Sequence, residues 1–172
     1  MNIFYTHSDP AQCAKEHCNV HTNKMIIETA QILSTAHRVL DDNTDESLYK
    51  ATHKNHPSNL WVRSTNNNYT WAYCLLEALS KCYKQRTGKD HNTWLRVKDV
   101  LSSPPINIEC GWFSPPPYCG PKEYKKLDTK ESYKYYLNMK FEEWQQRERK
   151  IKVEFYFGQP EWYEDGSSRK DL

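Results

Sequence analysis

Several features that would assign this chain to a familiar class are missing from it. Its 172 residues contain no apolar run near the roughly 20 residues that cross a bilayer, and its N-terminus has neither the basic start nor the apolar stretch of a secretory signal. No P-loop, Gly-rich dinucleotide turn, G-x-S-x-G elbow or H-E-x-x-H motif occurs. We therefore expect a cytoplasmic protein with no membrane partner.

An excess of charge of one sign is also absent. The 24 basic and 22 acidic side chains give a net charge of +2, which does not by itself indicate a nucleic-acid binder, although a local basic groove is compatible with it. Hydrophobic residues make up only 37% of the chain, and the mean hydropathy is -0.96. Because 6 Trp, 12 Tyr and 5 Phe supply large apolar areas, we expect one domain over residues 1–172 with an aromatic core.

Paired cysteine motifs are missing as well. The six cysteines include no C-x-x-C pair, and without an export signal we expect free, mostly buried thiols. His17 and His21 have the i, i+4 spacing of a zinc site. Lys24 and Glu28 follow on the same line, however, and a cation beside a metal ion is unfavourable. We expect no metal ion and no cofactor.

Hydrophobic periodicity predicts a mainly α-helical, compact single-domain bundle. A long, buried first helix is expected to begin at Pro10, with Ser8 or Asp9 as its N-cap, and to end near residues 38–40. Residues 2–5 and the alternating segment 151–157 have strand character, so the pattern allows a small two-stranded β element that pairs the N- and C-terminal segments.

Further helices are expected over 58–85, continuous or broken at 66–68, and over 93–101 and 128–146. Ser58 is placed to cap the first of these and Gly88 to follow its end. Residues 104–121 hold six prolines, which exclude regular structure, and aromatic residues that favour an ordered loop, either a lid over the core or an aromatic wall of a site. Residues 166–172 have the composition of a frayed tail.

A line of polar side chains distinguishes the first helix. Its members follow at spacings of three or four residues, so they share one helix face: His17, His21, Lys24, Glu28, Gln31 and Thr35. Apolar residues occupy most other sides, and ionisable groups in such a place need a partner or a purpose. Glu28, at the centre beside Lys24, is the candidate general acid or base; the alternative is a structural ion pair between the two.

A second group of candidate residues surrounds the loop before the second helix. It consists of His53, His56, Trp61 and Arg63. The planar guanidinium of Arg63 suits phosphate or carboxylate, and a helix N-terminus adds backbone donors for an anion. The alternative for each histidine is a solvated loop position. His91 is a third candidate, and a site requires that the helix stripe, the Arg63 group and His91 converge in space.

Lysine and arginine residues alternate with tyrosines over 118–152. Bases can stack on exposed aromatic rings while lysines track phosphates. Acidic residues are mixed into the same segment, so we expect a solvated face of mixed charge there.

Five segments together resemble one family. They are MNIF, DPAQCAKEHCNVHTNKMIIETAQILSTAHR, HKNHPSNLWVR, the GKDH turn and PEWY. These segments are similar to small phage proteins labelled pyrimidine dimer DNA glycosylases, of the endonuclease V type. The likeness extends over most of the chain, and its most specific parts are the first helix and the H-x-N-H-P-x-x-x-W-V-R block.

The resemblance implies a compact, mainly helical DNA-repair enzyme in the host cytoplasm. Such an enzyme flips a damaged base out of the stack, attacks the sugar with its N-terminal α-amine, and uses a glutamate of the first long helix as acid and base. Glu28 matches that glutamate, and Met1 carries the amine.

Two functions stay open. The first is a glycosylase-like protein that acts on a base, nucleotide or nucleic-acid strand. The second is a non-catalytic nucleotide-binding protein that sequesters a host signalling nucleotide and so counters antiviral defence. In both, the expected ligand- or phosphate-binding residues are His17, His21, Lys24, Gln31, His53, His56, Trp61, Arg63 and His91.

Overall fold

Six α-helices and one short 3-10 helix form the regular structure of residues 1–164, the part of the chain described by this computed structural model. The elements are α1 (Pro10–Lys15), α2 (Asn19–Leu40), α3 (Pro57–Val62), α4 (Asn66–Thr87), α5 (Asn92–Val97), η1 (Lys122–Tyr124) and α6 (Thr129–Gln146). The prediction of a mainly helical protein is confirmed. The predicted tail at 166–172 lies outside the described residues.

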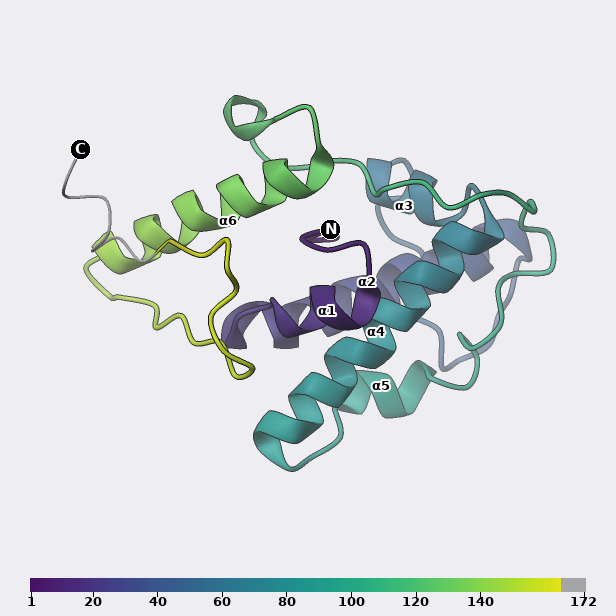
Figure 1. Cartoon of the computed structure of the whole chain (residues 1–172). Coiled ribbons are helices and arrows are strands. Elements are labelled where there is room, and N and C mark those ends of the chain that lie inside the picture. The colour runs from purple at the N-terminus through teal and green to yellow at the C-terminus, as the bar shows by residue number, and fades with distance from the viewer. Residues whose placement is uncertain (165–172) are drawn as a thin grey trace.

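The two 22-residue helices, α2 and α4, form the centre of the structure. They pack against each other, α1 packs on α4, and both α3 and α5 contact α2 (Figure 1). The N-terminal segment lies between α6 on one side and the α1 and α2 helices on the other, where the Phe4 ring meets His21 of α2 and Tyr133 of α6. The first residues of the chain are therefore enclosed by helices.

The core combines aliphatic residues of the central helices with aromatic residues from the whole chain. Met25, Ile26 and Leu33 of α2 are fully buried, and so is Tyr69 of α4. The Tyr69 hydroxyl is hydrogen-bonded to the ring of His37 and to the carbonyl of Leu101, as a buried phenol requires. Within residues 1–164, no helix has both the length and the apolar character needed to cross a membrane.

The single long first helix is a wrong prediction. The chain forms α1, leaves the helix over residues 16–18, and starts α2 at Asn19. Cys18 is extended there, and the Asn19 N–H donates to the carbonyl of Glu154 at 2.8 Å. This hydrogen bond joins residues 135 positions apart in the sequence and accompanies the break, so the local periodicity of the sequence does not indicate the break. Of the two predicted N-caps, Ser8 and Asp9, it is Asp9 that caps α1.

The predicted β element is also absent from residues 1–164. Two N–H groups of the N-terminal segment are bonded to side chains instead, since Asn2 N donates to Glu28 and Ile3 N donates to Asn2 Oδ1. The alternating C-terminal segment is held by α2, where the side-chain amide of Asn19 donates to the carbonyl of Lys152. The structure holds the two segments by these contacts instead of pairing them with each other.

The helical region after residue 57 follows the broken version of the prediction. α3 ends at Val62 and α4 begins at Asn66, so the break lies slightly before the expected 66–68. The N-cap of α3 is His56 rather than Ser58, because Pro57 occupies the first helical position and the His56 ring accepts from the Ser58 N–H. Gly88 ends α4 at φ +74°, as predicted.

The proline-rich segment 104–121 is an ordered loop without regular structure. Two side chains at the start of α4 hold this loop at Gly111. Asn66 Oδ1 accepts from the Gly111 N–H, and the Asn67 side-chain amide donates to the Gly111 carbonyl. Further along, Ser114 N donates to Asn68 Oδ1, and its carbonyl accepts from the indole of Trp61. α6 follows within one residue of its predicted limits.

Candidate functional site

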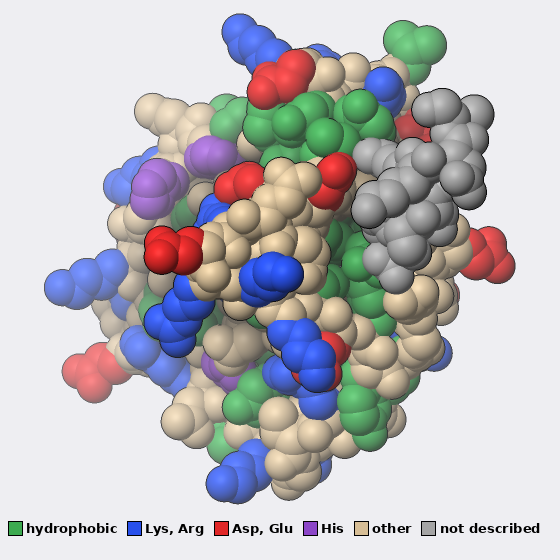
Figure 2. Space-filling model, turned by 90° about the vertical axis from the view of Figure 1, so that its left-hand side faces the viewer, with side chains coloured by type: hydrophobic (Ala, Val, Ile, Leu, Met, Phe, Trp, Pro, Cys, Tyr) green, Lys and Arg blue, Asp and Glu red, His purple; other side chains and the backbone are tan. Residues whose placement is uncertain are grey.

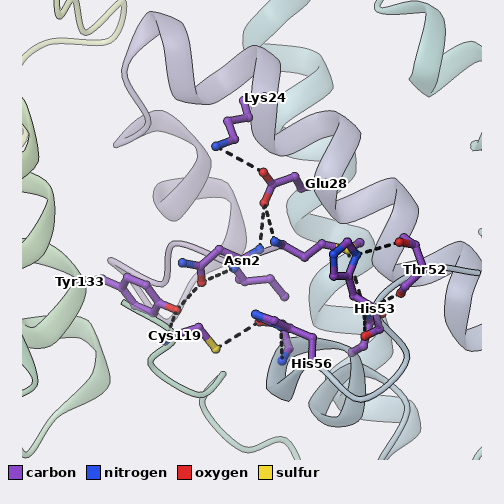
Figure 3. A network of polar contacts seen from close by, with 12 residues as sticks. Asn2, Lys24, Glu28, Thr52, His53, His56, Cys119 and Tyr133 are labelled. Carbon is purple, nitrogen blue, oxygen red and sulfur yellow. Dashed lines mark hydrogen bonds and ion pairs between the residues drawn. The ribbon is translucent and has the colours of Figure 1, made fainter. Parts of the chain in front are cut away.

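Glu28 forms the centre of a polar cluster at the start of the chain (Figure 3). Its Oε2 lies 2.8 Å from the backbone N of Asn2 and 3.9 Å from the α-amino nitrogen of Met1, and its Oε1 lies 3.4 Å from Lys24 Nζ. The Glu28 side chain is 17% exposed and that of Met1 only 5%. One carboxylate therefore receives two amines and one backbone N–H at the edge of the core. We call these groups the Glu28 cluster.

The periodicity of α2 places Glu28 at the edge of the core. Residues 25, 26, 29 and 30 on either side of it along the chain are buried, whereas Glu28 and Gln31 are half-buried. Lys24 lies one turn earlier with its side chain 58% exposed, so it reaches Glu28 from the solvent side. The middle of the polar line, at Lys24, Glu28 and Gln31, thus lies at the boundary between core and solvent.

A buried tyrosine fixes the N-terminal segment from the opposite side. The Tyr133 hydroxyl on α6 lies 2.6 Å from Asn2 Oδ1 and 3.0 Å from the carbonyl of Pro117, and it accepts from the N–H of Cys119. Tyr133 is fully buried, and burial raises the pKa of its hydroxyl, so it stays protonated as a donor. Because Asn2 and Tyr133 are 131 residues apart, no sequence pattern could connect them.

The loop before α3 brings His53 and His56 to the same place. His53 adopts φ +48°, a left-handed conformation uncommon for a residue with a side chain, and its Nδ1 lies 2.7 Å from Thr52 Oγ1. The Asn59 side chain holds the loop by donating to the carbonyls of Thr52 and His53. Asn59 Nδ2 also lies 3.8 Å from the sulfur of Met1, so the loop and the first residue are in contact.

His56 is held as a neutral ring. Burial lowers its pKa, electrostatic repulsion from the Met1 amino group and from His53 lowers it further, and Glu28 acts in the opposite direction. The Nδ1 atom accepts from the Ser58 N–H, so in the neutral ring Nε2 carries the proton. His56 is therefore a hydrogen-bond donor at neutral pH.

A cavity of about 670 Å³ opens beside this loop. We call it the cationic cavity, because three of its lining residues are basic and one is acidic; the residues are Gln31, Arg38, Glu46, Leu48, Tyr49, Lys50, Thr52, His53 and Arg96. Gln31 comes one turn after Glu28 on α2, and His53 belongs to the loop just described. Arg38, Lys50 and Arg96 were not among the predicted site residues.

His17 and His21 make no direct contact with Glu28. With the helix broken at 16–18, His17 precedes α2, and its Nδ1 is bonded to the carbonyl of Cys13. His21 is packed among Phe4, Phe141 and Trp144 with ring-centroid distances of 4.7 to 5.4 Å. Burial lowers the pKa of both rings, that of His17 to about 4. They are neutral parts of an aromatic core.

The remaining predicted residues, Trp61, Arg63 and His91, contact other parts of the protein. The Trp61 ring is 7% exposed. Arg63 donates to the carbonyls of Lys54 and Asn59, which ties the loop of His53 and His56 to α3. His91 caps α5 and contacts Asn23 and Tyr83. Of the predicted set, the structure brings together Met1, Lys24, Glu28, Gln31, His53 and His56, and it does not bring His17, His21 or His91 into direct contact with Glu28.

The charged C-terminal third carries interspersed charges. Several of its charged side chains are paired at short distance, as for Lys134 with Glu131 at 2.9 Å and Lys152 with Glu154 at 2.7 Å. On the face of the molecule shown in Figure 2, lysine and arginine side chains lie among acidic ones. The expectation of a mixed-charge face agrees with these pairs, and a uniform track for a nucleic-acid backbone is not seen on this face.

All six cysteines are free thiols, with Cys110 exposed and the others buried or half-buried. Within residues 1–164, no group of three or more His, Cys, Asp or Glu side chains has the arrangement of a metal site.

Comparisons of the chain with protein-family models, curated proteins and solved structures find no match. The chemistry of the Glu28 cluster therefore has to follow from its own geometry.

Proposed function

We propose that the Glu28 cluster binds a base, nucleotide or nucleic-acid strand and cleaves an N-glycosidic bond, as in the phage glycosylases that the sequence resembles. One observation carries this proposal. The α-amino nitrogen of Met1 lies 3.9 Å from a Glu28 oxygen, in a place where the Met1 side chain is 5% exposed. An amine beside a carboxylate is the pair that nucleophilic attack on a sugar carbon requires.

The proposed reaction uses these two groups in turn. The α-ammonium gives a proton to Glu28, and the free amine forms a bond to C1′ while the bond from C1′ to the base breaks. The departing base takes the proton from Glu28. One N–H proton then moves to O4′ as the sugar ring opens, which leaves a protonated imine between Met1 and the sugar.

Reduction of that imine tests the proposal. Borohydride should trap a covalent adduct on DNA that contains a damaged or abasic site, and Glu28→Gln should lower trapping at least about 100-fold, since loss of an acid–base group costs this much or more. Glu77→Gln is the matched control, because Glu77 also pairs with a lysine one turn away, at 3.0 Å, but on α4. Equal trapping by the two variants would exclude Glu28 from the reaction.

A specific observation favours the second function, a non-catalytic nucleotide binder. Both oxygens of Glu28 are occupied, one by Lys24 and the other by Asn2 N and the Met1 amine. The Met1 side chain is itself only 5% exposed, so the residue that carries the amine is enclosed by the surrounding structure. A carboxylate held in this way suits the positioning of a binding wall.

Ligand retention separates the two functions. A binder should keep a nucleotide through purification, visible by native mass spectrometry and identified after denaturation, and release it chemically unchanged. A glycosylase should instead yield free base from a damaged strand. Retention without turnover would assign sequestration of a nucleotide, such as a host signalling nucleotide, to the same cluster.

A further inference from the structure

We propose that the cationic cavity binds the phosphate group of the ligand whose base or sugar reaches Glu28. The identity of that ligand rests on the proposed function, whereas the binding of phosphate follows from the cavity itself. This assigns a role in recognition to Arg38, Lys50 and Arg96.

The charge of the lining favours an anion. Arg38, Lys50 and Arg96 face a single acidic side chain, Glu46. Within residues 1–164, the Lys50 ammonium has no hydrogen bond or ion pair, and Arg96 bonds neighbouring backbone through Nε and Nη2, so its Nη1 keeps its donors. Unused charged donors in a cavity are what a phosphate oxygen requires.

The two arginines also fix the wall of the cavity in advance. Arg38 donates to the carbonyls of Asn43, Asp45, Leu48 and Tyr49, and Arg96 to those of Glu46, Ser47 and Leu48. These carbonyl oxygens are directed to the guanidinium groups, so they do not oppose an incoming anion. A loop already held in this way loses little further conformational freedom on binding.

The remaining walls suit the sugar or base that accompanies a phosphate. The centroid of the Tyr49 ring lies 4.5 Å from the Arg96 guanidinium carbon, and the Tyr49 hydroxyl is hydrogen-bonded to Thr93 at 2.9 Å. Leu48, another residue of the lining, is buried. Small-molecule sites are of this kind, with volumes of roughly 300 to 1,000 Å³, an apolar wall and a few polar groups.

The cavity is connected to the Glu28 cluster through residues of the loop before α3. Thr52 and His53 line the cavity, and their carbonyls also receive the Asn59 amide that contacts Met1. The Thr52 N–H donates to Thr35 Oγ1 of α2, which fixes this strip against the helix that carries Glu28. A phosphate in the cavity therefore places the attached sugar along the His53 side, toward Met1 and Glu28.

The test compares 2-deoxyribose 5-phosphate with 2-deoxyribose, by isothermal titration calorimetry at fixed ionic strength. The phosphate should raise the affinity at least about tenfold, and Lys50→Ala should remove most of that gain, because it deletes one charge-assisted hydrogen bond. Lys89→Ala is the matched control, since Lys89 is an exposed lysine in the turn after α4. Equal affinities for the two sugars, or equal effects of the two variants, would overturn the phosphate site.

A competition arm identifies the source of the phosphate. A nucleoside 5′-monophosphate and an abasic oligonucleotide are each used to displace 2-deoxyribose 5-phosphate. Displacement by the first supports a free nucleotide and by the second a strand, whereas displacement by neither contradicts the site.

Borohydride trapping in the same samples separates the two proposals. If Lys50→Ala traps as much adduct as the unmodified protein at a low concentration of 2-deoxyribose 5-phosphate, the glycosylase reaction is retained and the phosphate site is rejected. If the binding of phosphate depends on Lys50 but the unmodified protein traps no adduct, the phosphate site is retained and the glycosylase reaction is rejected.

Discussion

Acid should destabilise this protein through His17. The ring is 6% exposed, its Nε2 has no hydrogen-bond partner, and burial lowers its pKa from 6.5 to about 4. Between about pH 6.5 and pH 4, His17 is therefore protonated in the unfolded chain and neutral in the folded protein. The stabilising effect of the neutral ring is fully present above pH 6.5 and is lost as the pH falls toward 4.

The size of the effect follows from the two pKa values. A difference of about 2.5 pKa units corresponds to a loss of about 3 kcal/mol when complete, of which about 2 kcal/mol is lost by pH 5. His21, whose pKa burial also lowers well below its usual value, adds to the loss in the same direction. A few kcal/mol is a large part of the stability of a small domain.

Urea unfolding followed by tryptophan fluorescence measures the effect. The free energy of unfolding of the unmodified protein should fall steeply between about pH 7 and pH 4, and a His17→Gln variant should fall less, by about 3 kcal/mol over that range. Parallel curves for the two proteins would refute the assignment of this pH dependence to His17.

Two further predictions concern positions that the structure holds tightly. Tyr133→Phe should lower the free energy of unfolding by about 2 kcal/mol, because it leaves the Cys119 N–H without its partner and frees Asn2; a loss below about 0.5 kcal/mol in urea unfolding would show that the hydroxyl is not needed. Gly88→Ala should cost about 1 kcal/mol through its φ of +74°, since an added Cβ meets no atom within 4 Å; Gly88→Asn should cost less, and equal losses in thermal unfolding would contradict a conformational origin.

Local signals in the sequence were sufficient for much of the fold. Asp9 before Pro10, Gly88 after α4 and the periodicity of α6 depend on neighbouring residues, and each is where the sequence places it. The break at 16–18 and the missing β element depend instead on contacts between Asn19 and the segment around Glu154. Such contacts between distant segments override local propensity.

The residues of the candidate site likewise fall into two groups, those that local sequence signals indicate and those that only tertiary contacts bring in. The helical spacing indicated Glu28 and Lys24 as neighbours on one face, and they are. The resemblance, not any pattern of spacing, suggested the Met1 amine. Tyr133 and Arg96 are brought to the site by tertiary packing alone, because each meets the N-terminal half of the chain across a long stretch of sequence. No spacing rule could have found them.

The pairing of the Met1 amine with Glu28 is tested most directly by locating the trapped sugar. The chain is treated with abasic DNA and borohydride, its intact mass is measured, and the adduct is mapped by peptide mass spectrometry. The proposed reaction predicts one adduct, on the α-amine of Met1, that is lowered at least about 100-fold in Glu28→Gln and unchanged in Glu77→Gln. An adduct on a lysine side chain, or none on the unmodified protein, would contradict it.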